Sequence, residues 1–289
     1  MYRYPDAIVE TGWLAANLDA PNLRIFDCTT HLLDATEPGQ PYRVESGRTD
    51  YDLGHIPGAG FLDLQGELSD AGSALRFMAP AAEQFAEAMS AHGVGDDSRV
   101  VLYSTANAQW ATRIWWMLRA FGFDNAAVLN GGWQKWRAEG RPLSTHPATP
   151  AAATFTARPR PGLFVGPDTV KQAIGDGAIC TLNALSPELH RGDSDRYGRP
   201  GRIPGSVNVP AASLLDPADN TFCDPQTVAA IFTDAGATPD KKVIAYCGGG
   251  IAATLDAFVL HQLGYTDIAV YDQSMSQWAR DQSLPIETG

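Results

Sequence analysis

The chain has 289 residues, a length that suits two domains of about 140 residues better than one. A net charge of −12 argues against nucleic-acid binding, which would need clustered lysine and arginine side chains. No apolar run approaches the ~20 residues that cross a bilayer, and the N-terminus lacks the basic and apolar blocks of a secretory signal. We therefore expect a cytoplasmic protein that binds neither nucleic acid nor membrane.

In chain order, short apolar strands alternate with amphipathic helices. In the first half the pattern predicts strands at 23–27, 100–103 and 126–129 and helices at 81–92 and 108–120. In the second half it predicts a strand at 243–246 and a helix at 254–263. Such alternation is typical of an α/β fold with a mostly parallel sheet flanked by helices.

The chain also contains an internal duplication. Four features recur in the same order roughly 145 residues later: a Gly-X-Ile-Pro-Gly motif, an apolar strand that ends in tyrosine, an aromatic or leucine beside glycine, and a tryptophan. Their positions are Gly54 and Gly201, Tyr103 and Tyr246, Gly122 and Gly264, and Trp136 and Trp278. A proline-rich stretch separates the halves. We predict domains at 1–145 and 165–289, joined by a linker at 146–164.

Four cysteines are present, namely Cys28, Cys180, Cys223 and Cys247. They form no CxxC pair and no spaced Cys/His set, so we expect no metal site, no disulfide framework and no organic cofactor. A lone cysteine is usually a small buried hydrophobic residue, and we expect this of the first three.

Cys247 differs from the others because it lies between a predicted strand and a predicted helix. It opens the segment Cys247-Gly248-Gly249-Gly250-Ile251-Ala252, at the carboxyl end of a parallel strand, where α/β sheets bind ligands. Successive glycines let several backbone N–H groups converge on one point, and a helix N-terminus adds partial positive charge there. Both effects stabilise a thiolate or a persulfide anion. The sequence therefore predicts that Cys247 is a nucleophile.

The duplication, the Gly-His-Ile-Pro-Gly-Ala turn that contains His55 and the strand–Cys–loop–helix order resemble the tandem-domain rhodanese family of thiosulfate/3-mercaptopyruvate sulfurtransferases. The resemblance covers essentially the whole chain. It implies two tandem rhodanese-like domains, of which the first is catalytically silent, with Ser104 at the cysteine position. It also implies that sulfane sulfur passes from a small donor, 3-mercaptopyruvate or thiosulfate, through a Cys247 persulfide. The acceptor would be cyanide, a thiol or a protein thiol.

The chain departs from the family pattern at several positions. Gly249 and Ala252 replace a serine and a threonine of the mercaptopyruvate-type loop, and Leu185 replaces a substrate-binding arginine. The downstream Asp-Gly-Ser-Trp pattern has become Asp272-Gln273-Ser274-Met275. These changes leave sulfur transfer through the cysteine intact but bear on the identity of the donor. With no basic side chain in the loop, we expect an organic donor such as mercaptopyruvate to be preferred over thiosulfate.

Arg191 and Arg202 are candidates for binding the donor, together with His55, which matches the family's interdomain histidine. Each has a plainer interpretation: His55 as a residue that ties down a turn, and the arginines, with Arg199, as solvated charges on a loop. We expect Trp110, Trp115, Trp116 and Trp133 mostly to pack in the core.

Two other functions fit parts of the pattern. A cysteine phosphatase would also place its cysteine before a helix, but its loop ends in arginine where this chain has Ala253. A non-catalytic rhodanese-like module that binds sulfur species or a protein would explain the altered loop, and cyanide-dependent thiocyanate formation distinguishes it from an enzyme.

Overall fold

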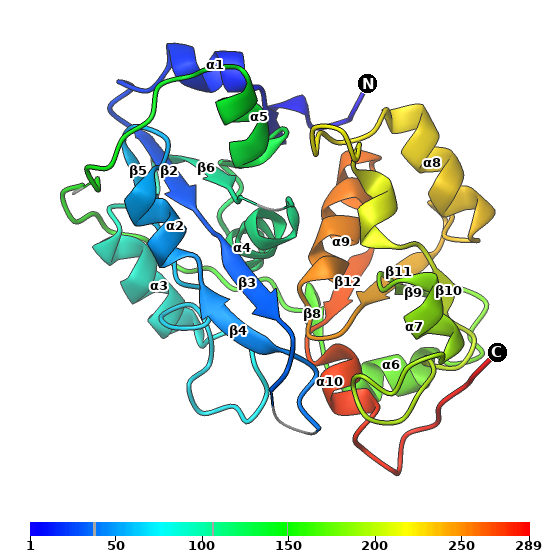
Figure 1. Ribbon diagram of the computed structural model, residues 1–289. Helices are drawn as coiled ribbons and strands as arrows, with labels where there is room; N and C mark the ends of the chain where they lie inside the picture. The colour runs from blue at the N-terminus through cyan, green and yellow to red at the C-terminus, as the bar shows by residue number, and fades with distance from the viewer. Residues whose placement is uncertain (37–38, 106, 149) are drawn as a thin grey trace.

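The computed structural model describes residues 1–36, 39–105, 107–148 and 150–289 (Figure 1). Its first half is built on a five-stranded, all-parallel sheet. In spatial order the strands are β1 (Ile8–Val9), β7 (Ala126–Leu129), β6 (Arg99–Tyr103), β2 (Leu23–Asp27) and β5 (Ala59–Phe61). The helical segments of this half are η1 (Pro5–Ala7), α1 (Thr11–Ala16), α2 (Arg48–Leu53), α3 (Ala82–Ala91), α4 (Gln109–Ala120) and α5 (Gly132–Ala138).

The second half repeats this plan. Its five parallel strands are, in spatial order, β10 (Val207–Asn208), β9 (Ile179–Asn183), β11 (Lys242–Tyr246), β12 (Ile268–Tyr271) and β8 (Phe164–Val165). Its helical segments are α6 (Pro167–Ala173), α7 (Pro187–Arg191), η2 (Ala211–Leu214), α8 (Pro225–Asp234), α9 (Ala252–Gln262) and α10 (Ser274–Trp278). The two parallel sheets with flanking helices confirm the predicted fold class.

Matching hydrogen bonds show that the duplication is structural. Tyr103 and Tyr246, each at the end of a central strand, accept a bond from the isoleucine amide of the Ile-Pro-Gly motif, at 3.3 and 3.2 Å. Trp136 and Trp278 each donate their indole N–H to a proline carbonyl six or seven residues later. The recurring tyrosines and tryptophans therefore form equivalent hydrogen bonds in the two halves.

An antiparallel hairpin, β3 (Thr30–Leu33) and β4 (Arg43–Ser46), leaves the first sheet and reaches toward α10 of the second half (Figure 1). At its tip the carbonyl of Pro41 accepts a bond from Arg196 Nε at 3.0 Å, and Gly39 O lies 3.5 Å from Arg280 Nη2. The hairpin thus brings residues of the first half to the edge of the second sheet.

The segment between α5 and β8 contains no helix and no strand among its described residues, because its prolines donate no backbone hydrogen bond. It nevertheless packs on the first domain: Phe155 is buried, 5.7 Å from the ring of Phe85 and 5.6 Å from that of Phe123. We propose that the boundary between the two domains lies in this segment, at 146–164.

The centre of the molecule is the contact between α4 and α9, which lie side by side between the two sheets (Figure 1). Thr112 and Thr254, at matching positions of the duplication, face each other with their hydroxyl oxygens 3.2 Å apart. Nearby, Trp115 meets Phe258 edge-on, with ring centroids 4.8 Å apart. Both helices are buried around most of their circumference, which explains why apolar residues occupy more than one face of each.

Candidate functional site

Cys247 is the first residue after β11, a central strand that pairs with β9 and β12. Its loop leads directly into α9, which begins at Ala252, two residues earlier than predicted. The cysteine is only 2% exposed. Gly250 adopts a left-handed conformation (φ 75°) that turns the chain into the helix.

The loop presents a row of free backbone donors. Within the described part of the chain, no protein acceptor is found for the N–H groups from Gly248 to Ala253. The last two of these belong to the first turn of α9, where N–H groups have no partner within the helix. Six consecutive unpaired donors beside a cysteine form a site that favours an anion.

Residues 274–276 hold this loop from the other side. The backbone N–H of Cys247 donates to Ser274 Oγ at 3.0 Å, and its carbonyl accepts from Met275 N at 3.0 Å. The carbonyl of Gly248 accepts from both the backbone N–H and the hydroxyl of Ser276, at 2.8 and 2.6 Å. These bonds turn the first two loop carbonyls toward α10.

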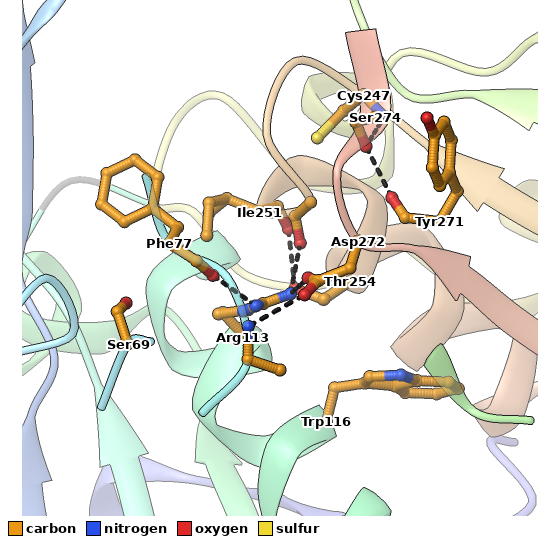
Figure 2. A network of polar contacts seen from close by, with 12 residues as sticks. Ser69, Phe77, Arg113, Trp116, Cys247, Ile251, Thr254, Tyr271, Asp272 and Ser274 are labelled. Atoms are coloured by element: carbon orange, nitrogen blue, oxygen red, sulfur yellow. Dashed lines mark hydrogen bonds and ion pairs between the residues drawn. The ribbon is translucent and has the colours of Figure 1, made fainter. Parts of the chain in front are cut away.

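The third anchor comes from the first domain. Arg113 of α4 donates to the carbonyl of Gly250 at 3.1 Å and to Asp272 Oδ1 at 2.7 Å (Figure 2). Its other terminal nitrogen donates to the carbonyl of Phe77 at 2.5 Å. The Arg113 side chain is wholly buried. A buried ion pair between the domains therefore lies directly beneath the cysteine loop.

Two of the three loop glycines are required by their surroundings. A Cβ on Gly250 would lie 2.5 Å from the backbone oxygen of Asp272, and a Cβ on Gly248 would overlap the Tyr197 side chain. Gly249 meets no contact shorter than 3.2 Å. Only Gly250 has a positive φ, so the curl that the sequence predicted for all three glycines depends on one of them.

Aromatic side chains from both domains cover the loop. Tyr42 from the hairpin and Tyr197 from the second domain meet edge-on with centroids 6.5 Å apart, and Phe77 stacks on Tyr42 at 6.3 Å. Burial, with a smaller effect of nearby Cys247, raises the pKa of Tyr42 to about 12 and that of Tyr197 further. Both phenols are therefore neutral at pH 7, and each has a proton to donate.

A pocket of about 220 Å³, lined by residues of both domains, opens beside Tyr42. Tyr42 and Ser276, which both contact the cysteine loop, lie at its inner end, and Leu75 contributes an apolar wall. Arg76 and Arg280 line it as well. Among the described residues neither arginine has a carboxylate partner within salt-bridge distance. The pocket is thus suited to an anion.

The structure gives the three predicted donor-binding side chains other partners. His55 is buried, with Nδ1 2.7 Å from the carbonyl of Tyr51 and Nε2 3.1 Å from that of His146. These contacts hold its turn in place, which is the structural role given above as the alternative to donor binding. Arg191 pairs with Asp193 at 2.8 Å, and Arg202 pairs with Glu287. None of the three lines the pocket beside the cysteine loop.

Two expectations about surface residues need correction. Arg199 is not a solvated charge, because its guanidinium donates to the carbonyls of Ala279, Trp278 and Asp281. Cys223 is not a buried hydrophobic residue but is partly exposed. Cys28 and Cys180 are buried as predicted, and burial raises the pKa of both thiols. The four tryptophans Trp110, Trp115, Trp116 and Trp133 are buried, in line with a packing role.

The matching loop of the first domain is closed. The hydroxyl of Ser104 donates to the carbonyl of Asn107, and the backbone N–H of Thr105 donates to Thr29 Oγ1 at 2.9 Å. Asn220 of the second domain lies against this loop, and the space left is about 10 Å³, room for little more than one water molecule. Unlike the cysteine loop, this one directs the hydroxyl of Ser104 and the N–H groups of Thr105 and Gln109 to protein acceptors.

Sequence reasoning missed Arg113, the two covering tyrosines and the arginines of the pocket. One signal was available for Arg113, a charged residue within a predicted helix that is otherwise rich in tryptophan. The others carry no such signal, because they reach the site from loops far apart in the chain.

Comparison with known proteins agrees with this architecture. The rhodanese-like domain family matches residues 10–139 and 184–281. The chain is 33% identical to the 3-mercaptopyruvate sulfurtransferase of Escherichia coli K12, covering 96% of this chain and 97% of that protein. It is 33% identical to the mitochondrial thiosulfate/3-mercaptopyruvate sulfurtransferase 1 of Arabidopsis thaliana, over 98% of this chain and 78% of that one.

The crystal structure of Escherichia coli SseA, described as having the rhodanese fold of 3-mercaptopyruvate sulfotransferases, superimposes with a TM-score of 0.80 at 31% identity. The match covers 93% of this chain and 98% of that structure. Fold, loop and relatives together define a rhodanese-type enzyme. The chain belongs to the tandem-domain rhodanese family of thiosulfate/3-mercaptopyruvate sulfurtransferases, and it is a sulfurtransferase.

Over the described residues, no helix has both the length and the apolar character needed to cross a membrane.

Proposed function

We propose that Cys247 is the nucleophile of this sulfurtransferase and carries the transferred sulfur as a persulfide. The observation that supports this most strongly is the row of six unpaired N–H groups from Gly248 to Ala253 that follows it. Gly248, Gly249, Gly250, Ile251 and Ala252 would hold the anionic sulfur with their backbone donors alone. No organic cofactor or metal takes part in this chemistry.

In the first half-reaction the Cys247 thiolate attacks the sulfane sulfur of the donor. A bond forms between Sγ and that sulfur, while the bond that held the sulfur in the donor breaks and its electron pair leaves with the remaining group. From thiosulfate the leaving group is sulfite. From 3-mercaptopyruvate it is the pyruvate enolate, which takes up a proton. Tyr42 and Tyr197, neutral phenols beside the loop, could deliver one.

In the second half-reaction an acceptor removes the outer sulfur. The acceptor, a thiolate or cyanide, attacks the terminal sulfur of the persulfide. The S–S bond breaks, and its electron pair returns to Cys247 Sγ. This order gives ping-pong kinetics. The physiological acceptor would be a low-molecular-weight thiol or a protein thiol, with cyanide as its laboratory substitute.

We also propose that the donor binds with its anionic group in the interdomain pocket. Arg76 and Arg280 lie there without carboxylate partners among the described residues, whereas Arg191 and Arg202 pair with acidic side chains. Arg76 and Arg280 are therefore better placed to bind the carboxylate or sulfonate group of a donor. Because Cys247 is 2% exposed, Tyr42 or Tyr197 must move aside before a donor held in the pocket reaches the sulfur.

Intact-mass measurement after treatment with thiosulfate or 3-mercaptopyruvate tests the nucleophile. Wild type should gain one sulfur atom, and Cys247→Ser should gain none. Cys223→Ser is the matched control, because Cys223 is the most exposed of the four cysteines. If Cys247→Ser gained the sulfur equally, the assignment would be wrong.

Steady-state kinetics test the donor pocket. Arg76→Ala and Arg280→Ala should each raise KM for the donor by about three- to tenfold with little change in kcat, because they contribute binding and not chemistry. Arg158→Ala, an exposed arginine paired with Asp96 on the first domain, serves as the control for loss of surface charge. A KM unchanged in both pocket variants would place the donor elsewhere. Measuring thiosulfate and 3-mercaptopyruvate side by side also tests the expected preference for the organic donor.

A further inference from the structure

Arg113 belongs to the first domain, but its guanidinium forms hydrogen bonds to the second. It donates to the carbonyl of Gly250 and to the carboxylate of Asp272, and it also holds the carbonyl of Phe77, the residue that stacks on Tyr42 (Figure 2). The side chain is wholly buried, and its charge lies 4.8 Å from the centre of the Phe164 ring. One side chain therefore joins the cysteine loop, the segment that follows β12 and the aromatic cover.

The Arg113–Asp272 ion pair has no counterpart at the matching positions of the duplication. On the opposite side of the α4–α9 contact, Leu255 follows Thr254 as Arg113 follows Thr112, and Asn130 stands where Asp272 stands. One backbone bond is kept on both sides: Ala79 N donates to Asp272 Oδ2 at 2.8 Å, and Phe222 N donates to Asn130 Oδ1 at 2.9 Å. The junction thus has neutral residues at these positions on one side and an ion pair on the other, and the ion pair lies on the side of Cys247.

The two loops also differ in where their carbonyls point. In the first-domain loop, the carbonyl of Asn107 accepts a hydrogen bond from Ser104, the residue at the cysteine position. In the Cys247 loop, the carbonyl of Gly250 is held by Arg113 instead. The C=O and N–H of a trans peptide point in opposite directions, so fixing this carbonyl on Arg113 turns the N–H of Ile251 the other way. A carbonyl turned toward the sulfur would instead repel a thiolate.

We propose that Arg113 is a positioning residue for sulfur transfer: by holding Gly250 O and Asp272 it keeps the loop's N–H groups available to the Cys247 sulfur. The first domain, which carries serine at its own loop, thereby takes part in the chemistry of the second. This inference rests on the proposed role of Cys247 as the nucleophile.

The test compares charge-neutral and charge-conserving variants. Removing Arg113 alone would leave Asp272 as an unpaired buried charge and threaten folding, so the main variant is Arg113→Leu/Asp272→Asn, which copies the residues of the other half. We expect this protein to fold, with kcat lowered by about ten- to a hundredfold and KM for the donor within about twofold of wild type. Arg113→Lys, which keeps the charge but cannot reach all three acceptors, should recover part of kcat.

A readout that needs no donor separates this inference from the proposed function. Alkylation of Cys247 by iodoacetamide, followed at peptide level, should slow in parallel with kcat in the double variant and be partly restored in Arg113→Lys. Arg119→Leu/Asp124→Asn removes a partly exposed ion pair near the end of the same helix, and with it the contact of Arg160 with Asp124. It is the matched control, with rates expected at the wild-type level.

A double variant that folds and is alkylated at the wild-type rate, or an Arg113→Lys protein with full kcat, would overturn the positioning role. A different result, a gain of sulfur by Cys247→Ser, would contradict the proposed function itself.

Discussion

At the scale of single residues, the loop glycines make a sharp prediction. Gly250→Ala should destabilise the protein by about 2–4 kcal/mol, because alanine is strained at φ 75° and its Cβ would meet the Asp272 backbone at 2.5 Å. Urea denaturation measures this loss of unfolding free energy.

Gly248→Ala is the comparison variant. Its Cβ would meet the hydroxyl, Cζ and Cε1 of Tyr197, so the whole ring has to rotate away, and we expect a smaller loss of about 1–2 kcal/mol. Displacing that hydroxyl should open the cover over Cys247 and speed its alkylation. Equal destabilisation by the two substitutions would contradict this account of the loop.

Asp27 provides a pH prediction at the same scale. It is the last residue of β2, and burial raises its pKa from 3.8 to about 6 although bonds from Thr29 act in the opposite direction. The unfolded chain therefore loses this proton at lower pH than the folded chain does. The proton on Asp27 therefore stabilises the folded state. This stabilisation is complete below pH 3.8 and is lost as pH rises through about 6. At about 1.4 kcal/mol per pKa unit, the loss is of the order of 3 kcal/mol.

Asp27→Asn should remove this loss, since Asn183 already occupies the matching strand end and accepts the same kind of backbone bond at 2.9 Å. The variant should therefore be more stable than wild type at pH 8, with the advantage shrinking toward pH 4.5. Urea denaturation at both pH values checks this. The reverse change, Asn183→Asp, should lower stability at pH 8. An advantage that does not vary with pH would rule out titration of Asp27 as its cause.

At the scale of elements, sequence patterns predicted four buried strands, β2, β6, β7 and β11, and the helices that follow β6 and β11. The buried strands β9 and β12 were not predicted. The strands at 23–27 and 126–129 match β2 and β7, and the end of α4 before Gly122 is confirmed by that residue's left-handed conformation. The edge strands β1, β8 and β10 were missed, because two residues carry no periodicity.

The site could be predicted only where it is local in sequence. The cysteine, its glycines and the helix behind it are consecutive, so their arrangement follows from chain order. Tyr42 and Arg113 lie more than 100 residues from Cys247 and reach its loop only because the domains pack together. His55 shows the converse, since its motif suggested a site residue whereas its ring nitrogens lie against two backbone carbonyls.

The first-domain loop gives a prediction about this element as a whole. Ser104→Cys in a Cys247→Ser background should gain no sulfur from thiosulfate or 3-mercaptopyruvate, because Thr105 N and Gln109 N already donate to protein acceptors and only about 10 Å³ of space is left. Intact-mass analysis measures the gain, with wild type as the positive control. A persulfide on residue 104 would mean that the cysteine alone, and not the geometry of its loop, decides where sulfur binds.

At the scale of the whole molecule, the two domains share one core. Helices α4 and α9 pack along their lengths, the Arg113–Asp272 pair is buried between them and the second sheet, and the N-terminal segment crosses to the second domain. There Tyr4 stacks on His261 with centroids 4.3 Å apart, and Arg3 N donates to the carbonyl of Gln262 at 2.8 Å. Neither domain could separate without exposing apolar surface and an unpaired charge.

The chain should therefore unfold as a single cooperative unit in spite of its two-domain architecture. Amide hydrogen exchange should give β6 and β11, the strands that end beside Ser104 and Cys247, the same opening free energy, and calorimetry should show one transition. Trp115→Ala removes the edge-on contact with Phe258 across the junction and should lower the protection of both strands together, by about 3–5 kcal/mol. If β6 lost protection and β11 kept it, the two domains would unfold independently of each other.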